Sequence, residues 1–167
     1  VRWPSKIKGG QKTEALACLT DFYATMQDLT GQAVEDKGGE DSFSLLPVFG
    51  GKAQSDRRSL ISHSIGGSFS IRQGDWKLCL SSGSGGWSAP REPDAKKANL
   101  PPLQLFNLKA DRAEQKNLVQ ENPKEVNLLL NLLQKEVTQG RCSPGNPVPN
   151  DRDVTFLPKG VTIPWKN

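Results

Sequence analysis

The sequence predicts an α+β fold in which a small antiparallel β-sheet of about four strands is packed by one long C-terminal helix. Two observations predict it: short runs of alternating apolar and polar residues recur between residues 59 and 108, and a long amphipathic segment follows residue 122. A strand and a helix are expected ahead of them, in residues 1–55. The chain has 167 residues, the length of one domain or of one domain with a piece of another.

Residues 1–55 are expected to run strand, loop, helix, loop. The helix begins near Thr20, which suits an N-cap, and Asp21 follows at the positive end of the helix dipole. Apolar residues recur there at helical spacing: Leu19, Phe22, Tyr23 and Met26. Gly31 can end the helix with a positive φ. The stripe predicts a helix with one apolar face.

Strands are expected at residues 59–63, 68–72, 76–80 and 103–108. The second and third form a hairpin around Gln73-Gly74-Asp75. Apolar positions alternate along this hairpin and predict its buried face: Phe69, Ile71, Trp76, Leu78 and Leu80. Residues 81–99, which are rich in Gly and Pro, are expected to form a long loop without regular structure.

The long helix is expected to begin at Asn122, with Pro123 at its first position, and to end at Gly140. Its apolar stripe should cover the apolar face of the sheet. The stripe consists of Val126, Leu129, Leu130, Leu133 and Val137. The proline-rich tail that follows is expected to run extended and to be pinned by Phe156 and Trp165.

Charge and cysteine spacing exclude several classes of protein. The net charge of +4 is spread along the chain, whereas a nucleic-acid binder concentrates its Lys and Arg on one stripe. The adjacent basic pairs, Arg57-Arg58 and Lys96-Lys97, are expected on the solvated surface. No apolar run approaches the ~18 residues of a membrane span, so we expect neither nucleic acid nor a membrane as a partner. Cys18, Cys79 and Cys142 lack C-x-x-C spacing, and whether any two pair is left open.

No complete catalytic or metal-binding motif occurs: G-x-S-x-G and Walker A sequences are absent, and no carboxylate has a diagnostic neighbour. We therefore expect no catalytic residue and no metal ligand in this chain. The candidate substrate-binding residues are His63, which is the one imidazole, Gly66 and Gly67, where backbone can approach a ligand, and Trp87, which can stack on a sugar. The alternatives are a polar strand end for His63 and a packed loop anchor for Trp87.

Several segments, in order along nearly the whole chain, are similar to motifs of one enzyme family. They are 1–7 (VRWPSKI), 19–26 (LTDFYATM), 39–47 (GEDSFSLLP), 69–78 (FSIRQGDWKL) and 105–108 (LFNL) with Asp111, Glu114 and Asn117-Leu118. Together they resemble the C-terminal part of a sulfatase, in the bacterial arylsulfatase A-like family of the alkaline phosphatase superfamily. Arg112-Ala113 departs from the family's usual Pro-Gly, which loosens a turn and does not touch the chemistry.

The resemblance implies a sulfuric ester hydrolase of the arylsulfatase type, acting on aryl or carbohydrate sulfates. Family members use a formylglycine, made from a Cys or Ser in a C-x-P-x-R motif, and a calcium ion held by Asp and Asn side chains. Both are implied to lie in an N-terminal catalytic region upstream of this chain, which alone should bind neither and be inactive. Residues 142–146 (CSPGN) end in Asn where that motif has Arg, so Cys142 is expected to be an ordinary thiol.

By the same resemblance, residues 1–55 correspond to the end of the α/β catalytic domain, so their strand and helix are its remnant. Residues 56–167 correspond to the C-terminal subdomain, whose loops would help to line the substrate pocket. The implied partners are the N-terminal catalytic region of the same protein and a sulfated small molecule or glycan. A periplasmic or secreted location is implied for the parent enzyme. The apolar face of the first helix would lack its cover, so self-association of the isolated chain is expected.

Two other functions stay open from the sequence. A stand-alone carbohydrate-binding or interaction module would need an exposed aromatic platform at Trp3, Trp87 or Trp165. A phosphate- or phosphonate-ester hydrolase of the same superfamily would differ in metal ligands that lie outside this chain.

Overall fold

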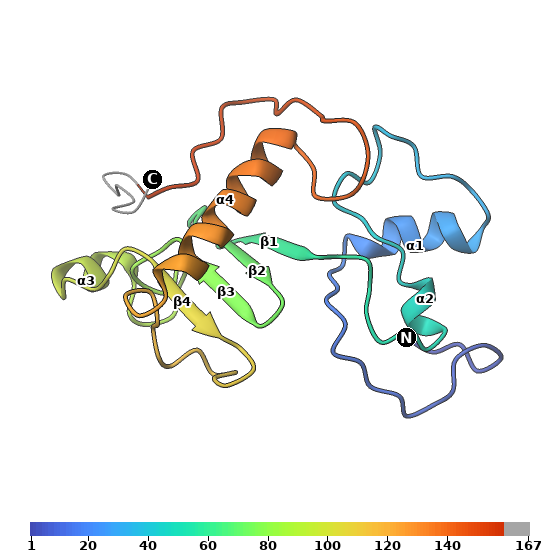
Figure 1. Ribbon diagram of the computed structural model, residues 1–167, viewed down its shortest axis with the longest axis horizontal. Helices are drawn as coiled ribbons and strands as arrows, with labels where there is room; N and C mark the ends of the chain where they lie inside the picture. The colour runs from blue at the N-terminus through green and yellow to red at the C-terminus, as the bar shows by residue number, and fades with distance from the viewer. Residues whose placement is uncertain (159–167) are drawn as a thin grey trace. The chain divides into compact units, whose positions relative to one another are not determined.

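The computed structural model describes residues 1–158, which form two compact units (Figure 1). The first unit holds residues 1–60 and 138–149, and the second unit holds residues 61–137 and 150–158. The helices are α1 (Asp21–Leu29), α2 (Leu46–Phe49), α3 (Glu92–Lys97) and α4 (Pro123–Gln139). The strands are β1 (Ser59–His63), β2 (Phe69–Gln73), β3 (Trp76–Cys79) and β4 (Gln104–Asn107). The predicted α+β class is confirmed.

The four strands form one sheet in the order β1-β2-β3-β4. Antiparallel register places Ile71 opposite Leu78 and Leu78 opposite Leu105, so three fully buried side chains form one row across the sheet. Gly74 turns the hairpin with a φ of +56°. The predicted strands are confirmed to within one residue at each end.

Helix α4 lies across one face of this sheet (Figure 1). Its buried side chains are Val126, Leu129, Leu130 and Leu133, which join the sheet residues in one hydrophobic core. Val137 packs at the edge of this core, so the predicted stripe is confirmed. Phe156 of the tail also packs there, with its ring 6.4 Å from that of Phe69. Trp165, the other expected anchor, lies outside the described residues.

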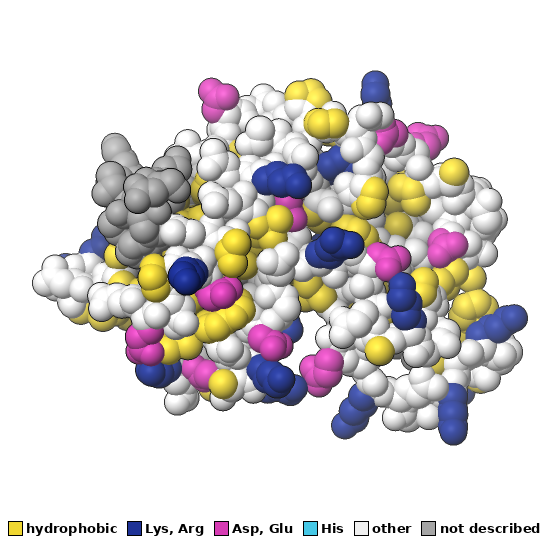
Figure 2. All heavy atoms as spheres, in the orientation of Figure 1, with side chains coloured by type: hydrophobic (Ala, Val, Ile, Leu, Met, Phe, Trp, Pro, Cys, Tyr) yellow, Lys and Arg dark blue, Asp and Glu magenta, His cyan; other side chains and the backbone are white. Residues whose placement is uncertain are grey.

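Helix α1 buries Ala24 and two polar side chains, and it exposes its large apolar side chains. Asp21 and Thr25 are buried, and the Thr25 hydroxyl accepts a hydrogen bond from the backbone N–H of Leu45 at 2.9 Å. Thr20 stands at the predicted N-cap, but its hydroxyl donates to the carbonyl of Asp41 and makes no capping bond to the helix. The predicted apolar residues, Leu19, Phe22, Tyr23 and Met26, are all exposed. Figure 2 shows hydrophobic side chains at the surface in the region of α1.

Two expectations about local structure are wrong. Residues 81–99 contain the helix α3, because Pro93 and two acidic residues suit a first turn, two lysines suit a last turn, and Ala95 is buried. No strand occurs within residues 1–55. Instead the backbone N–H groups of Lys6 and Ile7 both donate to the carbonyl of Trp3, and this turn replaces an extended strand. None of the helices in the described part of the chain combines the length and apolar character of a membrane span.

Candidate functional site

The residues expected to contact a ligand lie on the second unit, around the loops that follow β1 and β3. His63 is the last residue of β1, and its side chain is exposed. Its ring meets the ring of Phe69 edge to face, with the centroids 4.2 Å apart. Packing against Phe69, a partly buried neighbour of the core, fixes one side of the imidazole and leaves the other toward solvent.

Gly66 and Gly67 lie in a tight turn between β1 and β2. The backbone N–H of Gly67 donates to the carbonyl of Ser64 at 3.0 Å, and Gly67 has a φ of +77°. The N–H of Gly66 donates to the carbonyl of Gly85 at 3.3 Å. A Cβ at Gly66 would lie only 3.0 Å from that same oxygen. Glycine therefore permits this turn to approach the loop that contains Gly85 and Trp87.

Trp87 stands on the loop between β3 and α3. Its side chain is 77% exposed, so the alternative of an anchor packed on the sheet is wrong. The loop beneath it is cross-braced: the N–H of Ser84 donates to the carbonyl of Pro90 at 2.9 Å, and the Ser84 hydroxyl donates to the carbonyl of Ser88 at 2.7 Å. The indole is thus held out from the surface on a defined support.

Sequence reasoning missed Arg91, which directly precedes α3. Its Nε donates to the carbonyl of Trp87 at 3.3 Å, so an exposed cation and the exposed indole share one loop. The available signal was a basic residue four positions after the tryptophan in a Gly- and Pro-rich segment.

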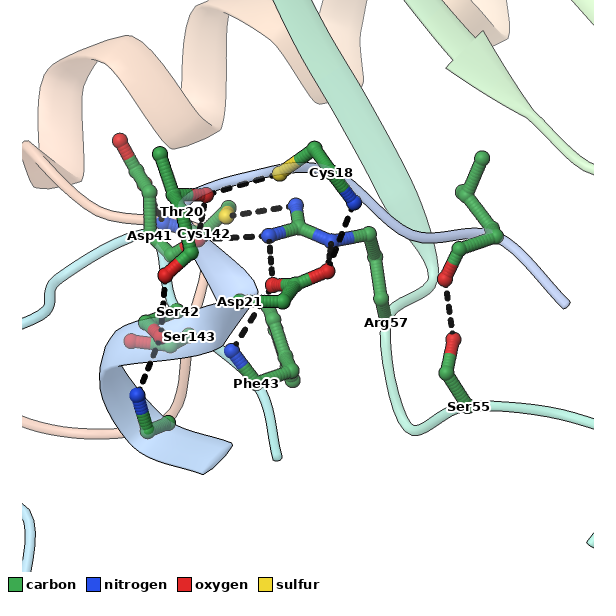
Figure 3. Close-up of polar contacts among 12 residues, drawn as sticks. Cys18, Thr20, Asp21, Asp41, Ser42, Phe43, Ser55, Arg57, Cys142 and Ser143 are labelled. Carbon is green, nitrogen blue, oxygen red and sulfur yellow. Dashed lines mark hydrogen bonds and ion pairs between the residues drawn. The ribbon is translucent and has the colours of Figure 1, made fainter. Parts of the chain in front are cut away.

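The first unit contains a buried ion pair (Figure 3). Arg57 is 5% exposed, so its expected place on the solvated surface is wrong, whereas Arg58 is exposed. The Arg57 Nε donates to Asp21 Oδ2 at 3.1 Å, and the Arg57 Nη2 donates to Asp21 Oδ1 at 2.5 Å. Asp21 also accepts the backbone N–H groups of Cys18 and Phe43. The carboxylate therefore joins α1 to three other segments of the first unit.

The Arg57 guanidinium has no donor left for a ligand. Its remaining contacts are to the carbonyls of Ser59 and Asp41 and to the Sγ of Cys142, which lies 3.6 Å from Nη1. Together these contacts engage all of its N–H groups. Burial by itself lowers the pKa of Arg57, but hydrogen bonding to Asp21 and the charge of Asp21 outweigh burial and raise it. The residue is a permanent cation with a structural role.

The described residues do not fit calcium, and the sequence contains no complete formylglycine motif. Within residues 1–158, no group of three or more His, Cys, Asp and Glu side chains could hold a metal ion. Cys142 follows the C-terminal end of α4, and its N–H donates to Asp41 Oδ1. At the fifth position of its motif, Asn146 donates its side-chain amide to Asp36. We assign no step of hydrolysis to residues of this chain.

Cys79, at the end of β3, is not an activated nucleophile. Burial raises the pKa of its thiol to about 11, while the charge of Lys77 lowers it and that of Glu114 raises it. Lys77 forms an ion pair with Glu114, with the Nζ and Oε1 atoms 2.7 Å apart. The thiol stays protonated at neutral pH and acts as a small apolar side chain.

We expect Cys79→Ala to reduce the loss of stability that the protein undergoes in alkaline solution. The folded thiol keeps its proton up to a pKa of about 11, whereas the unfolded thiol loses it near the ordinary value of 9.0. Stability supplied by this thiol is therefore present below pH 9.0 and is lost as the pH rises toward 11. Urea unfolding at neutral and alkaline pH measures this, and an equal alkaline loss in both proteins would contradict it.

A cavity of about 310 Å³ lies in the first unit and is lined by residues 1–4 and 7–11. It contains Trp3, one of the aromatic rings available for a sugar platform. Its lining includes none of the expected substrate-binding residues and no carboxylate side chain. The loops after β1 and β3 contribute no residue to it.

No family model matches the chain. The chain is 27% identical, over 139 residues, to an N-acetylgalactosamine-6-O-sulfatase of Bacteroides thetaiotaomicron. The aligned region covers 83% of this chain and 27% of that protein. A structure solved in work on the metabolism of multiple glycosaminoglycans by Bacteroides thetaiotaomicron matches with a TM-score of 0.67 and 27% identity, over 82% of this chain and 28% of that one.

A further structure, of a protein in complex with its substrate D-glucosamine-2-N,6-O-disulfate, matches with a TM-score of 0.60 over 87% of this chain and 28% of that one. At 23% identity this likeness shows the fold alone. The chain thus spans 27–28% of the length of these relatives.

Proposed function

Because the chain is homologous to sulfatases, we propose that it is the C-terminal part of an enzyme that hydrolyses sulfate esters of glycans. The observation that carries this proposal is the identity to an N-acetylgalactosamine-6-O-sulfatase over 83% of the chain. The substrate class that follows is a sulfated amino sugar. The four-stranded sheet with its long helix has the same fold as the matched region of solved relatives, which supports the same assignment.

The catalytic groups lie outside this chain in our proposal. The chain spans only 27% of its relative, residues 1–158 hold no group that fits a calcium site, and the sequence contains no complete formylglycine motif. Calcium, when bound in the parent enzyme, supplies positive charge against the sulfate oxygens. The N-terminal catalytic region of the same polypeptide is thus the first partner of this chain, and the family resemblance favours a periplasmic or secreted enzyme.

The second unit supplies part of the substrate pocket in this proposal. His63, Gly66, Gly67 and Trp87 lie on or beside neighbouring loops, and the indole of Trp87 is exposed on a braced support. An exposed aromatic face and an exposed imidazole on the same unit suit the apolar face and the hydroxyl groups of a sugar.

The test is sulfate release from 6-O-sulfated N-acetylgalactosamine by the longer protein that includes this sequence and by the 167-residue chain alone. Release by the longer protein and none by the chain is expected. Turnover by the chain would contradict the placing of the catalytic groups. Hydrolysis of a sugar phosphate in place of the sulfate would point to a phosphate- or phosphonate-ester hydrolase.

The exposed Trp87 also favours a second candidate, a carbohydrate-binding module without hydrolytic activity. Glycan binding by the longer protein without release of sulfate from any sulfated glycan would favour it over a sulfatase.

A further inference from the structure

Trp87 and Arg91 lie together at the surface of the second unit. Trp87 is 77% exposed, Arg91 is also exposed, and the Arg91 Nε lies 3.3 Å from the carbonyl oxygen of Trp87. That hydrogen bond uses one of the five N–H groups of the guanidinium. The Nη groups are left to bind a ligand.

No carboxylate of the described residues neutralises Arg91 through an ion pair. The nearest acidic residue in sequence, Glu92, instead accepts the backbone N–H of Gly83 at 2.7 Å and that of Ser82 at 3.4 Å. Asp94 follows in the first turn of α3 and is exposed. Arg91 therefore keeps its charge and its bidentate edge available for an anion.

The loop that carries both residues is held from several sides. Gln104 of β4 donates its amide to the carbonyls of Ser81 and Gly83, at 2.9 and 2.8 Å. A Cβ at Gly83 would collide with the carbonyl of Pro90, so the two ends of the loop lie close together. Bracing of this kind lowers the conformational entropy that a ligand-binding loop loses on binding.

Ile65 is a second exposed apolar side chain, and it lies near the loop of Trp87. It lies at the tip of the turn after β1 and is 73% exposed. A Cβ at Gly86 would lie 3.5 Å from Ile65 Cγ2, so the isoleucine packs beside the residue that precedes Trp87. Two large apolar side chains are thus exposed on neighbouring loops of the second unit.

We propose that Trp87 and Arg91 form a subsite for a sulfated sugar residue, in which the indole stacks on the apolar face of the ring and the guanidinium binds the sulfate oxygens. This subsite rests on the proposed function, and it names Arg91 as the group that distinguishes a sulfated sugar from an uncharged one. Arginine suits this role because its planar fork binds tetrahedral oxyanions through two parallel hydrogen bonds.

The experiment uses titration calorimetry to measure how the 167-residue chain binds a 6-O-sulfated N-acetylgalactosamine disaccharide. The same disaccharide without sulfate is titrated in parallel. Trp87→Ala should weaken binding of both sugars about tenfold, and Trp87→Phe should retain most of it. Arg91→Gln should weaken binding of the sulfated sugar about tenfold and leave the unsulfated sugar unchanged. Lys96→Gln, which removes an exposed cation from α3, is the matched control and should change neither.

Equal binding of the two sugars by the native chain would overturn the proposal, as would equal effects of Arg91→Gln and Lys96→Gln. Binding of neither sugar would also overturn it. The same variants in the longer protein separate the two proposals. Sulfate release with an unchanged KM in Arg91→Gln would overturn the subsite and leave the sulfatase assignment intact. Arg91-dependent binding without any sulfate release would overturn the sulfatase assignment and support the subsite.

Discussion

Replacing Arg57 by Met is expected to lower the free energy of unfolding by about 3–5 kcal/mol. The substitution keeps an apolar stem of similar length but removes the cation that faces the fully buried carboxylate of Asp21. The carboxylate keeps hydrogen bonds from the N–H groups of Cys18 and Phe43, yet its charge is left without a counter-ion in a buried place. Urea unfolding, followed by circular dichroism, measures the loss.

Arg58→Met is the matched control, because Arg58 is the neighbouring residue and is exposed. Its effect should stay within about 0.5 kcal/mol.

The double variant Asp21→Leu with Arg57→Met should be more stable than Arg57→Met alone, because it removes the uncompensated charge. The raised pKa of Arg57 means that the guanidinium keeps its part of the pair's contribution until strongly alkaline pH, and loses it as the pH rises through the folded-state pKa. Equal stability of the Arg57 and Arg58 variants would contradict the structural role.

The second unit was predictable because its signals are local. Alternation along the hairpin identifies Ile71 and Leu78 as buried, and helical spacing identifies Leu129 and Leu133. The apolar face of the sheet and the apolar face of α4 bury each other, so a single arrangement of helix on sheet satisfies both patterns. The short helix α3 was missed because its six residues hold a single buried side chain, Ala95, and show no apolar period.

The first unit was less predictable because its main interaction is remote in sequence. Arg57 and Asp21 are 36 positions apart, and nothing in the Arg57-Arg58 pair distinguishes the buried residue from the exposed one. Periodicity identified the apolar face of α1 correctly as a pattern, but a pattern does not show whether another element covers the face. In the described residues Phe22 and Met26 are exposed.

The candidate site was partly predictable. A tryptophan in a glycine-rich loop left two interpretations open, a sugar-stacking platform and a packed anchor, and the exposure of Trp87 contradicts the anchor. The role proposed for Arg91 could not be predicted from the sequence, because it depends on the hydrogen bond to the Trp87 carbonyl and on Glu92 accepting the N–H of Gly83. Such contacts arise only when the loop folds back on β4.

Leu133→Ala is expected to lower the free energy of unfolding by about 2–5 kcal/mol. Leu133 is 0% exposed at the centre of the α4 stripe, where it packs in the core with the sheet residues. Removing three carbon atoms there loses the free energy gained by transferring them from water into the core. It also leaves a cavity that the packed sheet does not fill.

Leu128→Ala makes the same chemical change on the same helix, where the side chain is 59% exposed. Its effect should stay within about 0.5 kcal/mol, because alanine has the higher helix propensity and little apolar area is buried. Paired unfolding curves of the two variants isolate the packing of α4 on the sheet from the propensity of the helix. Equal losses in both would mean that α4 contributes through its helicity alone and does not hold the sheet that positions the loops around Trp87.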